Sequence, residues 1–403
     1  MFRQIKSVLL VVVLVLSGTS AYLLWRNTLP LVSPIALVEV LSGHSTASKS
    51  PKIIYGFFPY WNLKYANDIN INSLTHFAYF AVDLNSNGTI NKVNIKNEQE
   101  PGWNKLNSKT TGKLLYQSQL LGQKTVLTVT AMEPDIIDSI LNDRLNAATA
   151  ISSILSVYRD FNFNDLNIDF EYVGKPSLSI RKNFVIFIQD LKAACLNLNK
   201  NCQLDIDIFA DSGSKSRLWD LGALNSTVDH FIVMAYDYYR KNSAQAGPVA
   251  PLTGKCQTGR TSACLDQDIL THLSQITKLL SPEKILLGIP FYGYEWQTTS
   301  RNFLANIYPR TGSLASYSRI QSLFSDPTVS SLSAVWSETT LSPYLIFETG
   351  SETHQIYYED PASLQQKIKL VKSAGLGGIA IWAIGYETPY QELWGPINDL
   401  SSP

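Results

Sequence analysis

Eight short apolar runs rich in β-forming residues recur along the chain, and longer segments with helical periodicity separate several of them. The runs lie at residues 52–58, 74–82, 124–131, 166–171, 203–209, 229–236, 284–293 and 377–385. Strands that alternate with helices favour right-handed βαβ units and a parallel sheet. Eight such units predict an α/β fold of the (β/α)8 barrel type. An open doubly wound sheet is the alternative, but no G-x-G-x-x-G follows the first run.

One long segment departs from the alternation. Between the earlier runs, apolar residues repeat at helical spacing, as Ile269, Leu273 and Ile276 do within residues 265–280. Residues 297–356 instead mix turn residues with short β-like pieces. We therefore expect a small α+β insertion between the seventh and eighth strands, on the barrel rim, where it would form one wall of a groove.

The N-terminus has the pattern of a membrane anchor. Arg3 and Lys6 precede an uncharged, mostly apolar stretch from Ser7 to Trp25, which is about the length needed to cross a bilayer as a helix. The positive flank should stay in the cytoplasm, so the rest of the chain would lie outside it. Residues 1–26 thus predict a transmembrane signal anchor and a single-pass protein of the cell membrane. A cleaved signal peptide and a secreted protein are the alternative.

The remainder divides into a linker and one folded domain. Residues 27–51 hold three prolines and end in small polar residues, which indicates a linker before a domain at 52–403. The chain is 45% apolar and carries 33 basic and 33 acidic residues. This composition is typical of a globular protein, and the absent basic excess argues against a nucleic-acid partner.

The four cysteines form two pairs that are close in sequence. An exported protein with this spacing should form disulfides between Cys195 and Cys202 and between Cys256 and Cys264. There is no C-x-x-C spacing, and the five histidines are scattered without a ligand pattern. We expect neither a metal nor a cofactor.

The fourth run, within "NDLNIDFEYVG" (164–174), carries a polar row. Residues two apart on a strand share a face, so Asn167, Asp169 and Glu171 should point into the barrel while the apolar residues between them pack outward. Glu171 comes last, at the end of the strand where barrel enzymes keep their active sites. Burying adjacent carboxyls is costly unless they share a proton or gain donors, which favours function over a structural polar ladder.

This stretch resembles the D-G-x-D-x-D-x-E signature of glycoside hydrolase family 18, the chitinase-like enzymes. Three further segments resemble that family's strands six, seven and eight, in this order: "VMAYD" (233–237), "LLGIPFYGYEW" (286–296) and "GLGGIAIWAIGYE" (375–387). "AGPVAPL" (246–252) and residues 357–378 resemble its bacterial spore-cortex-lytic and spore-germination branch more narrowly. Asn164 and Asn167 stand where the signature has Asp, whereas Asp169 and Glu171 are retained.

The resemblance implies a substrate-assisted mechanism, in which the 2-acetamido oxygen of the sugar is the nucleophile. Glu171 would protonate the glycosidic oxygen, Asp169 would accept the acetamido N–H, and Tyr236 would donate to the acetamido oxygen. For Met234, packing inside the barrel is favoured over contact with the substrate. The further substrate-binding residues that the resemblance implies are Asn167, Asp237, Trp382 and Met234. Tyr292, which belongs to the seventh run at the same rim, and Tyr55, in the first run, are candidates because of their positions.

The implied function is hydrolysis of β-1,4-linked N-acetylglucosamine polymers by an exported glycosidase that acts as a monomer. Peptidoglycan-type glycan is favoured over chitin, because the narrower resemblance is to cortex-lytic enzymes. A catalytically silent glycan-binding barrel is the alternative, although its usual mark would be loss of the terminal Glu, and Glu171 is present. A scaffold protein would need repeats, and we find no internal repeat.

The anchor hypothesis is tested by the N-terminus of the mature protein. The uninterrupted apolar run predicts that the protein stays with membranes and keeps its initiator region. Fractionation followed by N-terminal peptide mapping checks this. A soluble form that begins near Tyr22 would instead establish a cleaved signal peptide.

Overall fold

The fold is described from a computed structural model, which defines residues 51–93, 96–255 and 264–400. The predicted anchor at 1–26, and the predicted linker apart from residue 51, lie outside these residues. Within the part of the chain that is described, no helix combines the length and the apolar character needed to cross a membrane.

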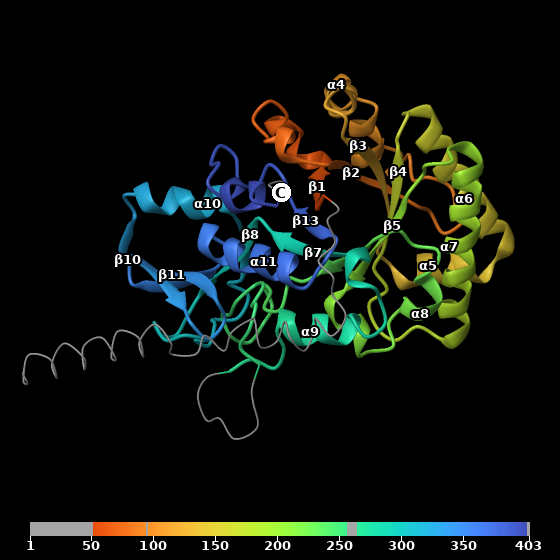
Figure 1. Cartoon of the computed structure of the whole chain (residues 1–403). Helices are drawn as coiled ribbons and strands as arrows, with labels where there is room; N and C mark the ends of the chain where they lie inside the picture. Colours follow the sequence, from red (N-terminus) through yellow and green to blue (C-terminus); the bar gives the residue numbers. More distant parts are fainter. Residues whose placement is uncertain (1–50, 94–95, 256–263, 401–403) are drawn as a thin grey trace, which may run out of the picture. The chain divides into compact units, whose positions relative to one another are not determined.

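Eight parallel strands close into a barrel, as the alternation of runs predicted (Figure 1). Each strand coincides with one predicted run, and none extends more than one residue beyond it. Around the barrel, β1 lies between β13 and β2, and Ile53 is paired with Gly378. The strands are β1 (Ile53–Pro59), β2 (His76–Asp83), β3 (Lys124–Ala131), β4 (Asp165–Phe170), β5 (Leu204–Phe209), β6 (Phe231–Met234), β7 (Ile285–Pro290) and β13 (Gly378–Trp382).

Helices surround the barrel on its outside (Figure 1). Several begin at side chains that accept hydrogen bonds from the first turn, such as Ser108, Asp143 and Ser177. Asp360 forms a capping box with Ser363. The helices are α3 (Pro101–Leu106), α4 (Lys109–Leu120), α5 (Pro134–Asn142), α6 (Arg144–Asp160), α7 (Leu178–Leu198), α8 (Leu221–Leu224), α9 (Ile269–Ile276), α11 (Pro361–Ser373) and α12 (Trp394–Asn398).

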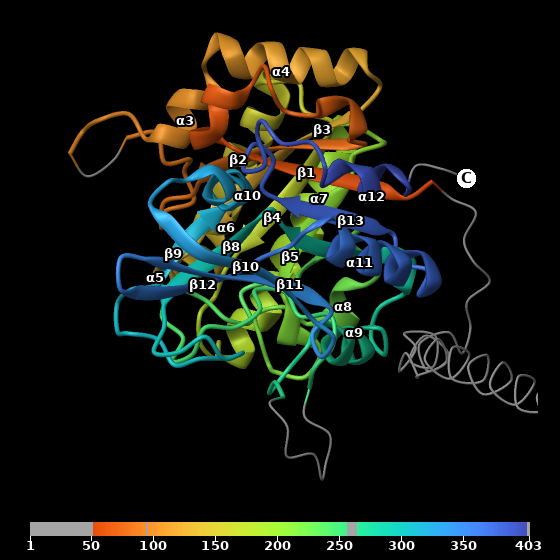
Figure 2. The same cartoon turned by 90° about the vertical axis from the view of Figure 1, so that its left-hand side faces the viewer.

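Residues 292–357, between β7 and α11, form a five-stranded antiparallel sheet with one α-helix, which confirms the predicted α+β insertion. Figure 2 shows this sheet in front of the barrel. The insertion begins at Tyr292, earlier than the expected 297, because the apolar run 284–293 contains both β7 and the first residues of β8. Its elements are β8 (Tyr292–Gln297), β9 (Ser313–Ser316), α10 (Tyr317–Ser322), β10 (Val329–Ser337), β11 (Ser342–Thr349) and β12 (Glu352–Tyr357).

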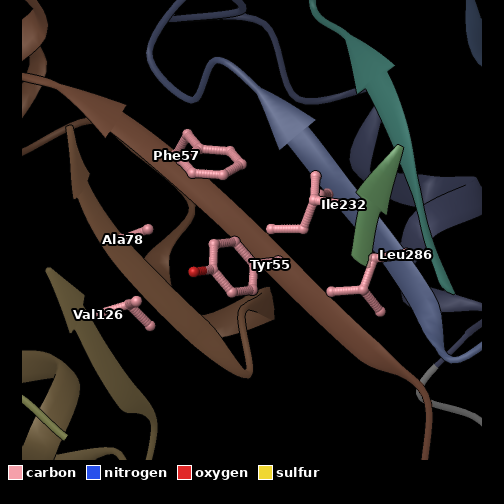
Figure 3. Close-up of a cluster of buried hydrophobic side chains, with 7 residues drawn as sticks. Tyr55, Phe57, Ala78, Val126, Ile232 and Leu286 are labelled. Atoms are coloured by element: carbon pink, nitrogen blue, oxygen red, sulfur yellow. The ribbon is translucent and has the colours of Figure 1, made fainter. Parts of the chain in front are cut away.

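Apolar side chains from six strands fill part of the barrel interior (Figure 3). They are Tyr55, Phe57, Ala78, Val126, Ile232, Leu286 and Ala380, all buried. On β4 the alternation runs as predicted, because Phe170 points outward and its ring lies 6.0 Å from that of Phe184 and 5.8 Å from that of Phe187 on α7. The polar residues between the apolar ones therefore face the interior.

The predicted disulfide between Cys195 and Cys202 is confirmed. It joins the last turns of α7 to the segment that enters β5, and both residues are buried. Cys256 lies outside the described residues, so its pairing with Cys264 stays a prediction.

The Cys195→Ala/Cys202→Ala variant should lose about 2–3 kcal/mol of unfolding free energy, because the bridge restricts a short loop in the unfolded chain. Urea unfolding under oxidising conditions measures this loss. In a reducing buffer the wild type and the variant should converge, since any other bridge is lost from both. Equal stability of the two proteins under oxidising conditions would contradict the prediction.

Candidate active site

The polar row of β4 leads from the barrel interior to the rim where the strands end. Asn167 and Asp169 are buried within the strand. Glu171 follows directly after β4, is partly buried, and lines a cavity of about 610 Å³. The structure thus places the three residues as the alternation predicted, with Glu171 alone at the cavity wall.

A second carboxyl row on β5 was missed by the sequence analysis. Asp205 and Asp207 are both buried, and Asn167 Nδ2 donates to Asp207 Oδ1 at 3.1 Å. The signal was present in the sequence, because "LDIDIF" (204–209) has the same alternation as β4. Asp207 is therefore the direct partner of the residue that replaces the middle Asp of the family signature.

Three carboxyls of the site, those of Asp169, Asp207 and Glu171, have raised pKa values. Burial raises the pKa of Asp169 well above its usual range, and the neighbouring carboxyls of Asp207, Glu171 and Asp83 raise it further. The pKa values of Asp207 and Glu171 are also raised, first by burial. Asp169 Oδ1 has no hydrogen-bond partner in the described part of the chain. An acceptor therefore remains available below Glu171.

The end of β6 brings Met234, Tyr236 and Asp237 to the same cavity as Glu171. Asp237 has φ +61, a left-handed conformation that costs energy for residues with a side chain. Two hydroxyls hold its carboxylate in place, from Tyr292 at 2.5 Å and from Tyr294 at 3.0 Å. Both tyrosines come from β8, so the insertion positions Asp237. Strained backbone of this kind concentrates at functional sites.

Tyr236 fits against β7 because residue 288 has no side chain. A Cβ at Gly288 would lie 3.0 Å from Tyr236 Cε1 and 2.4 Å from the Val233 carbonyl oxygen. Burial, followed by four nearby carboxyls, raises the pKa of Tyr236 well above its usual range. Its hydroxyl is therefore a protonated donor at neutral pH.

Trp382, the last residue of β13, belongs to an aromatic cluster at the rim. It is partly buried, and its ring lies 4.5 Å from that of Phe80, 6.0 Å from Phe57 and 6.2 Å from Trp61. Trp61, in the 3-10 helix Tyr60–Tyr65, is 43% exposed and donates to the hydroxyl of Tyr386. Partly exposed rings of this kind suit an apolar sugar face.

Two of the predicted contact residues have other roles in the structure. Tyr55 is fully buried in the hydrophobic cluster and stacks on His76, so it has no surface with which to contact a polysaccharide and the prediction for it is wrong. The alternation along the first strand correctly predicted that Tyr55 points into the barrel. It does not tell how far along the barrel axis a residue lies from the rim where the substrate would bind. Tyr292 is 3% exposed and acts through its bond to Asp237. Within the described residues, no three His, Cys, Asp or Glu side chains gather as metal ligands.

Comparison with known proteins agrees with this geometry. A family model described as "Glycosyl hydrolases family 18" matches residues 53–387. A class V chitinase of Arabidopsis thaliana is 26% identical over 332 residues, which cover 79% of this chain and 82% of that protein. A cortical fragment-lytic enzyme of Bacillus anthracis is 22% identical over 80% of this chain, which spans 66% of that enzyme's length.

Solved structures show the same fold. The Cycas revoluta family 18 chitinase in complex with (GlcNAc)3 superposes with a TM-score of 0.72 at 20% identity. The superposition covers 87% of this chain and 99% of that structure.

The raised carboxyl pKa values predict how stability depends on pH. A carboxyl whose pKa is higher in the folded than in the unfolded state stabilises the fold below the unfolded value, about 4, and this stabilisation is lost as pH rises through the folded value. Asp207→Asn removes one such group and lowers the pKa of Asp169. The variant should therefore be more stable than wild type at pH 8, by on the order of 1–2 kcal/mol.

Urea unfolding at pH 5 and pH 8 measures this difference, which should shrink at pH 5. Asp190→Asn, at an exposed position on α7, is the matched control and should show little change at either pH. An Asp207→Asn variant that is less stable than wild type at pH 8 would contradict the prediction.

Proposed function

The chain belongs to family 18 of the glycosyl hydrolases and is a glycoside hydrolase, and from this premise we propose that it cleaves β-1,4 linkages in N-acetylglucosamine-containing polysaccharide. One observation carries the proposal. Glu171 lies on the wall of a cavity directly above Asp169, a buried carboxyl with an unpartnered oxygen. A general acid and an acceptor for an acetamido N–H are thus provided by one strand.

In the proposed reaction the substrate supplies the nucleophile, as this family is an exception to the usual pair of catalytic carboxyls. Glu171 gives its proton to the glycosidic oxygen while the acetamido carbonyl oxygen bonds to C1, so that the C1–O bond breaks and an oxazolinium ion forms. The Glu171 carboxylate then takes a proton from water, whose oxygen attacks C1 and reopens the ring. The configuration at C1 is retained. A raised pKa keeps Glu171 protonated for the first step.

Asp169 would stabilise the oxazolinium intermediate. Its free Oδ1 accepts the acetamido N–H, and this hydrogen bond favours the ionised carboxylate. Asp207, whose own pKa is raised by burial, keeps its proton beside Asn167, so Asp169 would be the one ionised carboxyl of the two. The negative charge of Asp169 then lies next to the positive oxazolinium ring.

The remaining residues would position the sugar. Tyr236 is a protonated donor for the acetamido oxygen, which its hydroxyl orients for attack on C1. Asp237, fixed by two tyrosine hydroxyls, accepts a hydrogen bond from the distorted sugar. Trp382 stacks under the sugar at the cleavage site, and Met234 contributes apolar contact at the cavity wall.

Peptidoglycan-type glycan is the proposed substrate class, with chitin second. The resemblance of residues 246–252 and 357–378 to the cortex-lytic branch supports this, and so does the relative named as a cortical fragment-lytic enzyme. We further propose that the protein is exported, is anchored in the cell membrane by its N-terminal segment and acts as a monomer. The Cys195–Cys202 disulfide supports export, since such bridges persist in oxidising compartments.

Glu171→Gln tests the proposed chemistry. The amide cannot transfer a proton, so turnover of N-acetylglucosamine oligomers should fall by about 10²–10⁴-fold while glycan binding is kept. Product analysis by mass spectrometry and isothermal titration with the same oligomers measure the two effects. Asp169→Asn should also be severe, and oligomers without the 2-acetamido group should not be cleaved.

Glu283→Gln is the matched control, because Glu283 is exposed and precedes β7 at the opposite end of the barrel. It should leave turnover unchanged. If wild type and Glu171→Gln bind oligomers equally and neither cleaves acetamido-sugar polymers, the protein is a glycan-binding barrel instead.

A further inference from the structure

A tight turn that follows Asp237 presents two adjacent cations. The backbone N–H of Arg240 donates to Ser243 Oγ at 3.0 Å, and the N–H of Ser243 donates to the Arg240 carbonyl at 2.8 Å. The Lys241 carbonyl accepts the indole N–H of Trp296 at 3.3 Å. A Cβ at Gly312 would lie 1.9 Å from that same carbonyl oxygen. The turn is therefore held against the inserted sheet.

The two cations line the same cavity as Asp237, whose raised pKa the charge of Arg240 partly offsets. Arg240 and Lys241 are exposed, and in the part of the chain that the structure describes neither forms an ion pair. By contrast, Arg217 on the wall of the catalytic cavity is bound to Asp211 through two hydrogen bonds, at 2.8 and 2.6 Å. Arg240 and Lys241 are thus available to an external anion.

Both cations line a second cavity of about 670 Å³ that borders the catalytic one. Its other lining residues are Asp237, Tyr238, Asn242, Ser243 and Tyr294. Asp237 is the one carboxylate among them, and it already accepts two hydrogen bonds. The cavity wall therefore has a positive excess and further neutral donors.

The second cavity is continuous with the first. Asp237, Tyr238, Arg240 and Ser243 line both, and the first contains Glu171. Glu171, Asp211 and Asp266 line only the first cavity, so they add no negative charge to the wall of the second. Asp211 is in addition paired with Lys215 and Arg217. A substituent on a sugar bound near Glu171 can reach Arg240 and Lys241.

We propose that this second cavity binds a carboxylate substituent of the glycan, of the kind that a lactyl ether presents on those sugars of peptidoglycan-type polymers whose carboxyl is not amide-bonded to a peptide. The proposal rests on the proposed function and specifies its substrate. Chitin-type polymers offer only neutral hydroxyl and acetamido groups here. A planar guanidinium beside an ammonium is suited to carboxylate, through charge-assisted hydrogen bonds. Arg240 and Lys241 are then specificity-determining residues.

The test compares three oligosaccharides of equal length: an N-acetylglucosamine oligomer, an N-acetylglucosamine/N-acetylmuramic acid oligomer with free carboxylates, and the same oligomer with its carboxylates converted to amides. Wild type should cleave the free acid with about tenfold higher kcat/KM than the amide, mainly through KM. This arm requires no substitution in the protein.

Charge removal in the protein should abolish that preference. In Arg240→Gln/Lys241→Gln the ratio of kcat/KM for the acid to kcat/KM for the amide should fall about tenfold, toward unity. Lys241→Glu should reverse the preference. Lys113→Gln, at an exposed position on α4, is the matched control and should leave the ratio unchanged.

Equal cleavage of acid and amide by wild type, or a ratio that the double variant does not change, would overturn the inference while the proposed function stands. Equal losses on both oligomers would also overturn it, since they would indicate general sugar contacts. Failure of wild type to cleave any of the three would instead remove the proposed function, and this inference with it.

Discussion

The site depends on carboxyls that are buried close to one another inside a closed sheet. Asp169 and Asp207 lie on neighbouring strands and are buried from water, and Asn167, a neutral donor, is hydrogen-bonded to Asp207. Two ionised carboxylates at this depth would repel each other strongly, so the site is stable with protons in place. In the proposed reaction, an acetamido N–H that binds above these carboxyls would favour the ionised form of Asp169.

The inserted sheet is part of this site as well as a wall beside it. Hydroxyls from β8 hold Asp237 in its left-handed conformation, and Trp296 of the same strand anchors the turn that carries Arg240 and Lys241. The barrel provides the buried carboxyls, and the insertion fixes the residues that follow β6. The proposed substrate contacts thus come from residues of the barrel, and the inserted sheet holds several of them in position.

Alternation along single strands allowed much of this to be predicted. Period-two polarity identified Asn167, Asp169 and Glu171 on β4, and the same pattern on β5 could have identified Asp207. It could not show that Tyr55 lies in the core, since all inward residues share one pattern whatever their depth. The role of the turn at 240–243 was also beyond the sequence, because this turn and β8 come into contact only in the folded chain.

The pairing of β1 with β13 has a consequence for biosynthesis. Ile53 finds its partner Gly378 near the other end of the chain, so the sheet cannot close before almost the whole domain has been made. Until then β1 and β7 each present an unpaired edge, which is a template for association with other chains. Long-range pairing of this kind is also slow. A chain that is truncated within the last strand, or stalled before it, would therefore be exposed to aggregation at both edges at once.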